Sequence, residues 1–483
     1  MKANSLWKNI SLGAVATAAI FPGCNQIKEN SKNYEMSNII FILADDLGYG
    51  DIGCYGQEKI KTPNIDKLAR EGIIFTQHYA GSTVCAPSRC CLMTGFHTGH
   101  TVVRGNKGIK PEGQFPMPEE TVTVAELLKK AGYVTAAIGK WGLGGPGSSG
   151  DPINQGFDYS FGYNCQSKAH FYYPESLWKN DEKVLLPENQ DGKHNTYSHD
   201  LFIKEALKFI TQNKDSSFFL YLPFTIPHAE LLVPENSLNQ YKGEFPEEPF
   251  EGGHYGAQET PRAAYAAMVS LMDEGIGKIM DLMKELEIDK NTLVIFTSDN
   301  GPHKEGGNDP DFFNSNGPFR GIKRDLYEGG IHVPFIVRWP DKIKPGRTSD
   351  HISAFWDFLP TVCDIANIEP PSNIDGISFL PELLEQEQPK HEYLYWEFHR
   401  SGHYNDKQAV RTGKWKAVRL NVNKNADADI ELYNLHEDIG EENNIAYDFP
   451  EIVKKMREIL KQAHTPAKEW PLFPEEFEAE KND

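Results

Sequence analysis

Short apolar runs alternate with amphipathic helical segments along most of the chain from residue 34 onward. Few polar residues interrupt these runs, which is typical of strands buried on both faces of a parallel sheet. Four runs that end in polar residues span 38–43 (NIIFIL), 133–138 (YVTAAI), 217–222 (SFFLYL) and 292–296 (TLVIF). Helical patterns at 124–130 and 268–286 precede two of them. We therefore predict an α/β fold with a mostly parallel central sheet flanked by helices.

The pattern changes after residue 381, where alternating apolar and polar positions replace the continuous apolar runs. Such alternation is typical of antiparallel strands. The expected strands are residues 391–398, 408–411, 414–420 and 431–435, and a helical pattern follows at 452–464. We therefore predict two domains, a large α/β domain over residues 34–381 and a small antiparallel sheet-and-helix subdomain over residues 382–483.

The first 24 residues have the pattern of an export signal. Lys2 and Lys8 precede an Ala-rich run over residues 10–21 that is too short to cross a bilayer. Gly23 directly before Cys24 resembles the lipobox of bacterial lipoproteins, in which that cysteine is acylated. We predict a lipoprotein-type signal peptide over residues 1–24 and export to the periplasm or outer membrane. The lipid anchor at Cys24 would be the protein's only membrane contact; ordinary signal cleavage is the alternative.

Composition and net charge narrow the possible partners. The 483 residues are 39% hydrophobic and 24% charged, which excludes wholesale disorder and a multi-span membrane protein. The formal net charge is −20. An acidic surface repels phosphate backbones, so we predict no nucleic-acid partner. An anionic substrate remains compatible with this charge, because a few Arg and Lys side chains in one cleft can override it.

The seven cysteines indicate neither a disulfide framework nor a zinc site. No CxxC pair is present, and a core of this size needs no disulfide bonds. We expect most of these residues to be buried free thiols. Cys85 is the exception, because it lies in a motif of its own.

Polar side chains that suit a metal ion follow two of the predicted strands. Asp45 and Asp46 come after the first strand, and Asp299 and Asn300 after the fourth. Ligands of open α/β sheets bind at the carboxyl ends of strands, so we expect these groups to converge. Oxygen ligands without His or Cys favour Ca²⁺ or Mg²⁺ over zinc. One acidic dipeptide alone is more often a helix cap or turn, whereas two at separate strand ends favour a metal.

The two other strand ends present groups for anion binding and proton transfer. Lys140 lies in GKW after the second strand, and His228 lies in PFTIPH after the third. Each side chain taken alone is more often solvated or satisfied within a core. Their positions beside the predicted metal ligands favour a shared site.

Residues 81–95 read GSTVCAPSRCCLMTG and contain the spacing C-x-P-S-R-x-x-x-x-T-G, starting at Cys85. This motif resembles the signature of the type I, formylglycine-dependent sulfatases of the alkaline-phosphatase-like superfamily. Companion motifs follow the family order and cover most of the chain: ADDLGYGD from residue 44, TPNIDKLA from 62, GKW from 139, PH from 227, TSDNG from 297 and RGIKRDLYEGG from 320. The resemblance implies a hydrolase of sulfate esters.

The resemblance also implies roles for individual residues. A maturase would oxidise Cys85 to formylglycine (3-oxoalanine), whose hydrate attacks sulfur with one hydroxyl and releases sulfate with the second. The implied calcium ligands are Asp45, Asp46, Cys85 as its hydrate, Asp299 and Asn300. The remaining implied catalytic residues are Arg89, which holds the hydrate, Lys140 and Lys323, which neutralise the sulfate, and His228, which protonates the leaving alcohol.

The chain departs from the family pattern at Gly142, where the family commonly has a histidine that contacts the hydrate. We expect the task of that histidine to be absent, taken by water, or supplied from elsewhere by His170 or His303. We assign both of these histidines to substrate binding. The departure affects the detailed mechanism and leaves the reaction class unchanged.

The aromatic-rich residues 161–178 (FGYNCQSKAHFYYPESLW) are expected to form a loop over the strand ends. Aromatic faces with a few polar groups suit a sugar ring, although the packing of a long loop explains the same composition. With the export signal, this favours an exo-acting carbohydrate sulfatase in glycan degradation. By resemblance, galactose or N-acetylgalactosamine sulfates are the favoured substrates.

Two other functions fit parts of the sequence. A phosphatase or phosphodiesterase of the same superfamily would share the acidic metal ligands, but such enzymes use Ser or Thr nucleophiles and typically two zinc ions. A non-catalytic glycan-binding lipoprotein with a sulfatase fold is supported only by Gly142. Turnover of an aryl sulfate by the matured protein separates these functions.

Overall fold

Strand β1 (Asn38–Ala44) is buried along its whole length, because strands pair with it on both sides and helices cover both of its faces. It pairs in parallel with β8 (Phe218–Pro223) and with β9 (Thr292–Ser298). Strand β4 (Val134–Lys140) pairs in parallel with the far side of β8. The four predicted buried strands therefore lie side by side, with their carboxyl ends at one edge of the sheet.

The computed structural model describes residues 36–399 and 405–480, and within them this sheet has ten strands. Five of its nine strand pairings are parallel, so the predicted α/β class with a mostly parallel sheet is confirmed. In spatial order the strands are β11 (Arg347–Ser349), β2 (Ile73–Phe75), β10 (Phe335–Arg338), β9, β1, β8, β4, β5 (Tyr159–Tyr163), β6 (Ser176–Lys179) and β7 (Glu182–Leu185).

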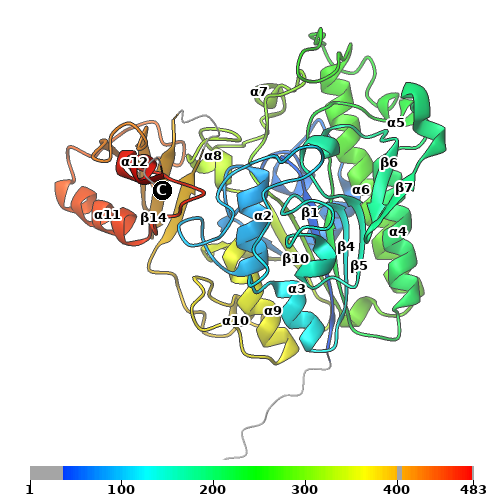
Figure 1. The fold of residues 1–483 in the computed structure, drawn as a ribbon, viewed down its shortest axis with the longest axis horizontal. Helices are drawn as coiled ribbons and strands as arrows, with labels where there is room; N and C mark the ends of the chain where they lie inside the picture. The colour runs from blue at the N-terminus through cyan, green and yellow to red at the C-terminus, as the bar shows by residue number, and fades with distance from the viewer. Residues whose placement is uncertain (1–35, 400–404, 481–483) are drawn as a thin grey trace, which may run out of the picture. The chain divides into compact units, whose positions relative to one another are not determined.

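Helices cover the two faces of this sheet (Figure 1). Alternate residues of β1 point to opposite faces, with Ile40 and Ile42 in one apolar cluster and Ile39 and Phe41 in the other. The first cluster includes residues of α1 (Pro63–Arg70), α4 (Ser198–Gln212) and α6 (Pro261–Glu285). The second includes residues of α2 (Cys85–Thr94), α3 (Val124–Lys130) and α9 (Phe358–Ala366). Both clusters fix the sheet edge at which the motif residues lie.

A second, four-stranded antiparallel sheet follows in the C-terminal part, as predicted. Its strands are β13 (Leu394–Phe398), β14 (Lys407–Thr412), β15 (Trp415–Leu420) and β16 (Ile430–Asn434). Helix α11 (Pro450–Gln462) packs on this sheet through Met456 and Leu460, and α12 (Pro474–Glu480) follows it. Figure 1 shows β14, α11 and α12 together in orange and red beside α8 (Glu328–Ile331).

Short elements connect these layers. Strands β3 (His78–Tyr79) and β12 (Ser353–Ala354) form a two-stranded sheet, and the remaining short helices are α5 (Glu235–Leu238), α7 (Pro310–Phe313) and α10 (Leu380–Leu383). None of the helices in the described ranges has the length and apolar sequence of a membrane crossing. The predicted signal peptide and Cys24 lie outside the described residues.

The aromatic segment 161–178 is only partly a loop, which corrects the sequence-based expectation. Its first residues belong to β5, which adds to the central sheet beside β4, and its last belong to β6. Between them, the single 3₁₀ turn η3 (Ser167–His170) lies near the strand ends. The aromatic residues therefore extend the sheet as well as covering its edge.

Candidate active site

Helix α2 places Cys85 beside the strand ends. All ten residues of this helix are buried, and Cys85, its first residue, is 1% exposed. The Cys85 Sγ atom lies 3.5 Å from Asp45 Oδ1 and 3.4 Å from Lys140 Nζ. Burial raises the pKa of the Cys85 thiol well above its ordinary value, and Lys140 offsets this only in part. The unmodified side chain is therefore a protonated thiol at neutral pH and a weak nucleophile.

Arg89 lies one turn further along α2 and ties the strand ends together. Its Nε and Nη2 atoms donate to Asp299 Oδ2 at 3.0 and 2.8 Å, and Nη1 donates to the carbonyl oxygen of Lys140. Nη2 also lies 3.6 Å from Asp45 Oδ2. The fully buried guanidinium of Arg89 thus holds three parts of the site together: the end of β4, Asp299 directly after β9, and helix α2.

Three carboxylates and one amide form the candidate metal site. Asp45, Asp46, Asp299 and Asn300 are all fully buried. The backbone N–H of Asp46 donates to Asp299 Oδ1 at 3.1 Å, and Asn300 Nδ2 donates to Asp46 Oδ1 at 2.7 Å. Asp46 has a φ of 64°, a strained conformation for a residue with a side chain. These contacts bring together all four predicted metal ligands.

The chemistry of this donor set fits a hard divalent cation. Burial, followed by the nearby charge of Asp45, raises the pKa of Asp299 to about 6, so the charged form of this carboxylate is disfavoured where it lies. Asn300 Oδ1 is buried without a hydrogen-bond partner, and leaving such an acceptor unpaired costs ~1–3 kcal/mol. A cation bound to these oxygens would stabilise the charged carboxylates and would give Asn300 Oδ1 a partner. Ligand atoms of Asp45, Asp46, Cys85 and His228 also lie within 4.8 Å of one another.

Two buried lysines neutralise the carboxylates. Lys140 Nζ lies 2.6 Å from Asp45 Oδ2, and Lys323 Nζ lies 2.7 Å from Asp46 Oδ2 and 3.2 Å from Glu305 Oε2. Burial opposes the charged form of both lysines, but these carboxylates outweigh it and raise both pKa values. Each lysine therefore offers a permanent positive charge beside Cys85 for an anionic group.

His228 lies next to Lys323 and is stacked between two other histidines. Lys323 Nζ donates to His228 Nε2 at 2.9 Å, and His228 Nδ1 contacts the carbonyl oxygen of Ala229. Burial, followed by the charge of Lys323, lowers the pKa of His228 well below its ordinary value. The ring centroids of His170 and His303 lie 4.4 and 5.6 Å from that of His228. The arrangement gives a neutral imidazole next to a protonated amine.

The two predicted substrate-binding histidines differ in their contacts. Both ring nitrogens of His303 face backbone groups: Nε2 lies 3.1 Å from the carbonyl oxygen of Pro227, and Nδ1 accepts from the N–H of Glu305 at 3.1 Å. His170 ends η3, and burial, then the charges of Lys140 and Lys323, lower its pKa to about 3. His170 is therefore available to a substrate as a neutral ring, whereas His303 supports its neighbours.

The space next to Gly142 is filled by a glutamine. Gly142 has a φ of 83°, and a Cβ atom built on it would lie 2.8 Å from Gln166 Nε2. This nitrogen is buried and has no hydrogen-bond partner. The side chain beside position 142 is therefore a neutral amide, which sequence analysis did not foresee.

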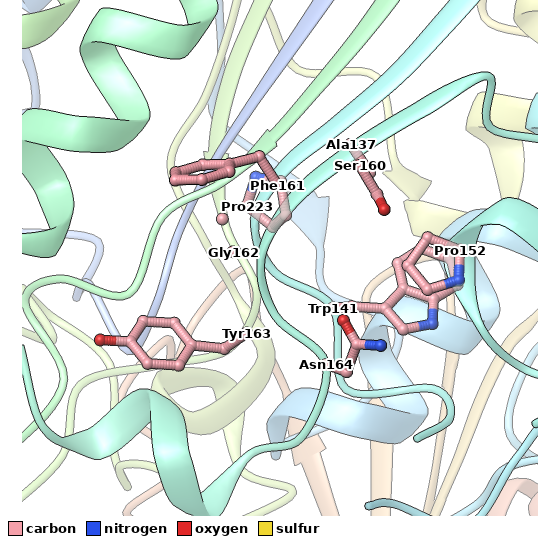
Figure 2. Close-up of a pocket in the computed structure, with 10 residues that line it drawn as sticks. Ala137, Trp141, Pro152, Ser160, Phe161, Gly162, Tyr163, Asn164 and Pro223 are labelled. Carbon is pink, nitrogen blue, oxygen red and sulfur yellow. The ribbon is translucent and has the colours of Figure 1, made fainter. Parts of the chain in front are cut away.

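A small cavity lies near the ends of β4 and β5 (Figure 2). Its volume is about 10 Å³, and Trp141, Asn164 and Pro223 are among the residues that line it. Such a volume holds about one water molecule. This cavity cannot accept a sugar, so it is part of the packing behind Lys140 and not a substrate site.

The structure thus gathers the predicted catalytic residues Cys85, Arg89, Lys140, His228 and Lys323 at one sheet edge with the metal ligands. Sequence reasoning missed Glu305 and Gln166. Glu305 lies two residues after His303 in an unremarkable polar loop, and Gln166 lies in the aromatic segment. Neither has a local signal, because neither belongs to a motif and only the folded chain brings each side chain to its partners.

The chain is similar to known proteins along most of its length. A family model described as Sulfatase matches residues 37–368, and one described as N-sulphoglucosamine sulphohydrolase, C-terminal, matches residues 320–466. The chain is 31% identical to an N-acetylgalactosamine-6-O-sulfatase of Bacteroides thetaiotaomicron over 95% of this chain and 100% of that protein. It is 34% identical to the N-acetylgalactosamine-6-sulfatase of Rattus norvegicus over 79% of this chain and 71% of that protein.

A solved structure is also similar to this chain in fold. The crystal structure of Ps i-CgsB in complex with k-i-k-neocarrahexaose is 28% identical in sequence and superposes with a TM-score of 0.76. The match covers 89% of this chain and 93% of that chain. The match therefore extends over most of this chain.

Proposed function

Because the chain belongs to the sulfatase family of the alkaline-phosphatase-like superfamily and is a sulfuric ester hydrolase, we propose that it releases sulfate from the non-reducing ends of sulfated carbohydrates. We further propose that Cys85 is matured to formylglycine by a maturase and that the acidic site binds Ca²⁺. The observation that carries the proposal is the position of Cys85 Sγ, 3.5 Å from Asp45 Oδ1 and 3.4 Å from Lys140 Nζ.

The nucleophile must differ from the thiol that the gene encodes. Burial keeps the Cys85 thiol protonated, and a thiolate that attacked sulfur could not then eliminate sulfate. A formylglycine hydrate supplies two hydroxyl groups, one for attack on sulfur and one for the release of sulfate. Lys140 and Asp45, both within 3.5 Å of this side chain, would hold and exchange the protons of those hydroxyls.

The metal site would be formed by Asp45, Asp46, Asp299 and Asn300, with the matured Cys85 as a further ligand. A bound Ca²⁺ would act as a Lewis acid that polarises sulfate oxygens. The all-oxygen donor set from Asp and Asn supports Ca²⁺ over zinc. Arg89 donates to Asp299 Oδ2, so it would orient this ligand and hold the nucleophile helix against it.

The two lysines and His228 would act on the substrate. Lys140 Nζ lies 3.4 Å from Cys85 Sγ, and the charge of Lys323 also acts on this side chain. Both lysines would hydrogen-bond the sulfate oxygens and stabilise the charge that develops there. His228 Nε2 accepts from Lys323 Nζ at 2.9 Å. Binding of the anionic sulfate ester would favour the protonated imidazole, so that His228 donates a proton to the leaving alcohol while Lys323 keeps its charge.

The choice of carbohydrate rests on the relatives, two of which carry the name N-acetylgalactosamine-6-sulfatase or its 6-O- form. We propose a 6-sulfated N-acetylgalactosamine or galactose as substrate. The N-terminal signal would export the enzyme, and a lipid anchor at Cys24 would hold it in the periplasm or on the outer membrane. There it would encounter such glycans.

The test is to express the chain with and without a formylglycine-generating maturase. The co-expressed protein should release sulfate from N-acetylgalactosamine 6-sulfate, and its Cys85 peptide should react with a hydrazide probe. Cys85→Ala should lose activity while unfolding at the same temperature, with Cys91→Ala as a cysteine control outside the contacts described above. A fully active protein whose Cys85 remains an unmodified thiol would refute the proposed nucleophile.

A further inference from the structure

Four segments that are far apart in the sequence meet outside Lys323 and His228. They contribute His170 from η3, Tyr255 from the loop before α6, Glu305 from the loop after β9, and Arg324 from the loop before α8. Each of these four side chains is partly exposed, whereas the groups behind them are buried. We call this set the rim. Because these partly exposed side chains contact the buried Lys323 and His228, the alcohol part of a sulfate ester held by those two residues would lie close to the rim.

Glu305 is the central residue of the rim. Its Oε2 atom lies 3.2 Å from Lys323 Nζ and 3.5 Å from the Tyr255 hydroxyl, and its Oε1 atom accepts from Arg324 Nη2 at 2.6 Å. Burial opposes ionisation, but Lys323 and Arg324 outweigh it and lower the pKa of Glu305 to about 2. The carboxylate is therefore charged, and its 18% exposed side chain can still accept a hydrogen bond from a ligand.

Hydrogen bonds to its backbone N–H and carbonyl oxygen hold Arg324 in place. Its side chain is therefore not needed to anchor the residue and can bind a ligand. The Arg324 N–H donates to the carbonyl oxygen of Thr83, next to the nucleophile segment, and its carbonyl oxygen accepts from Lys407 Nζ. Its φ of 77° is strained for a residue with a side chain, and such strain is concentrated at functional positions. The Arg324 side chain is 44% exposed and uses one nitrogen to contact Glu305. Its fork of donors can therefore reach a ligand.

Tyr255 and His170 form the apolar side of the rim. Their ring centroids are 5.7 Å apart and their planes are tilted by 58°, and His170 stacks on His228 at 4.4 Å. A sugar ring needs both an aromatic surface and precisely placed polar groups. The rim supplies the rings on one side and a carboxylate–guanidinium pair on the other.

We propose that Glu305 and Arg324, together with Tyr255 and His170, bind the sugar ring that carries the scissile sulfate, and that the Glu305–Arg324 pair recognises its hydroxyl groups. This assignment rests on the proposed function. A hydroxyl group can donate to Glu305 and accept from Arg324. Glu305 already neutralises Arg324 at 2.6 Å, so the pair has no net positive charge to attract a carboxylate. The preferred substrate is therefore a neutral sugar, without a uronate group at this position.

A merely structural role for the pair makes a different prediction. Glu305 also contacts Lys323, so its loss could act through that lysine on every sulfate ester. Arg324 contacts Glu305 and not Cys85 or the metal ligands. Substitution of Arg324 therefore tests sugar recognition more directly, and comparison of a sugar with a non-sugar ester separates the two roles.

The experiment uses the full chain co-expressed with a maturase and measures kcat and KM on N-acetylgalactosamine 6-sulfate and on 4-nitrophenyl sulfate. Arg324→Met should lower kcat/KM for the sugar roughly 10- to 100-fold, the effect of losing a charged hydrogen bond, and mainly through KM. Aryl sulfate turnover should change less than about threefold, since no rim hydrogen bond is lost there. Lys304→Met is the matched control, because Lys304 is 61% exposed and faces Asp311.

Glu305→Gln keeps the shape of the side chain and should also lower sugar turnover more than aryl turnover. Equal losses of kcat/KM on the sugar and aryl esters would refute the proposed subsite. They would mean that Glu305 and Arg324 position Lys323 instead. Unchanged sugar turnover in Arg324→Met would overturn the subsite while leaving the proposed function intact. If the unaltered protein hydrolyses only the aryl ester, the carbohydrate function itself fails. Saturation-transfer NMR with N-acetylgalactosamine reads the subsite without turnover, and equal signals from the unaltered protein and Arg324→Met would refute it.

Discussion

Two buried clusters of charged side chains differ in how completely their hydrogen bonds are satisfied. The reaction-centre cluster consists of Asp45, Asp46, Arg89, Lys140, Asp299 and Lys323. The C-terminal cluster consists of Arg104, Glu397, His399, His464 and Glu476, and it connects the loop after α2 with β13 and with the segment after α11.

In the C-terminal cluster, one carboxylate is surrounded by donors. Glu397 Oε1 lies 2.9 Å from both Arg104 Nη1 and His399 Nε2, and Oε2 lies 2.7 Å from both His464 Nδ1 and the Tyr395 hydroxyl. In the reaction centre, three carboxylates crowd together and the buried Asn300 Oδ1 has no partner. A saturated network stabilises the fold, whereas an incomplete one leaves polar atoms that a ligand can satisfy.

The largest expected effect comes from removing metal ions. Treatment of the matured enzyme with EGTA should abolish activity and lower the unfolding temperature, because a cation that binds only the native state stabilises it, by ~4 kcal/mol at a thousandfold excess over Kd. Added Ca²⁺ should restore both properties, as measured by turnover and by thermal unfolding. Restoration by Zn²⁺ and not by Ca²⁺ would favour the phosphatase-type chemistry instead.

Substitution of His228, which lies next to Lys323 of the reaction-centre cluster, should distinguish acid catalysis from sulfate binding. General acid catalysis is worth ~10²–10⁴-fold, and it matters most for a poor leaving group. His228→Ala should therefore reduce turnover of a sugar sulfate by that factor and turnover of 4-nitrophenyl sulfate far less, because nitrophenolate needs no proton. Steady-state kinetics on both esters provide the measurement. Equal losses would assign His228 to sulfate binding.

Substitution of Glu397 should affect stability and leave the chemistry unchanged. Glu397→Gln removes the charge that pairs with Arg104, and breaking a buried ion pair costs about 3–5 kcal/mol. Denaturant unfolding of the matured protein measures this loss, while kcat per folded molecule should stay within about twofold. Glu469→Gln is the matched control, because its pair with Lys107 is about half exposed and contributes at most about 1 kcal/mol. Loss of activity without loss of stability in Glu397→Gln would invalidate the distinction between the clusters.

The C-terminal cluster should also make stability depend on pH. Burial opposes protonation of His464, but its hydrogen bonds to Glu397 and Glu476 raise its pKa from 6.5 to about 9. A raised folded-state pKa gives stability that is complete below about pH 6.5 and is lost as pH rises through about 9. The free energy of unfolding should fall by roughly 3 kcal/mol at most over this range. His464→Gln should flatten this dependence, and an unchanged slope in that variant would assign it to other groups.

Most of the reaction-centre cluster was predictable from the sequence because Asp45, Asp46, Lys140 and Asp299 lie at or just beyond the ends of buried strands. Arg89 and Lys323 were predicted only from the family resemblance. Asp45 and Lys140 each lie at or one residue beyond the end of a strand, and parallel pairing with β8 brings these ends together. The rim was not predictable in the same way. Tyr255 and Glu305 lie in loops whose sequences have no periodicity, and only tertiary packing brings them within 3.5 Å of each other.

Local backbone geometry explains the other differences. The aromatic run after residue 160 contains Gly162 and Asn164, residues typical of turns, so β5 was not recognised as a strand of the central sheet. The neighbour of Gly142 could not be foreseen either, because Gln166 reaches it through the pairing of β4 with β5. Residue type predicts which groups carry the chemistry, while contacts between distant loops decide what surrounds them.

The burial of helix α2 sets the order of events in the biogenesis of this protein. Cys85 is 1% exposed and begins a helix that is buried throughout, so an enzyme could not reach this side chain in the folded protein. Under the proposed maturation, oxidation must therefore take place while the chain is still unfolded, in competition with the collapse of its own core. A host that secretes this protein faster than its maturase works would accumulate well-folded molecules that are permanently inert.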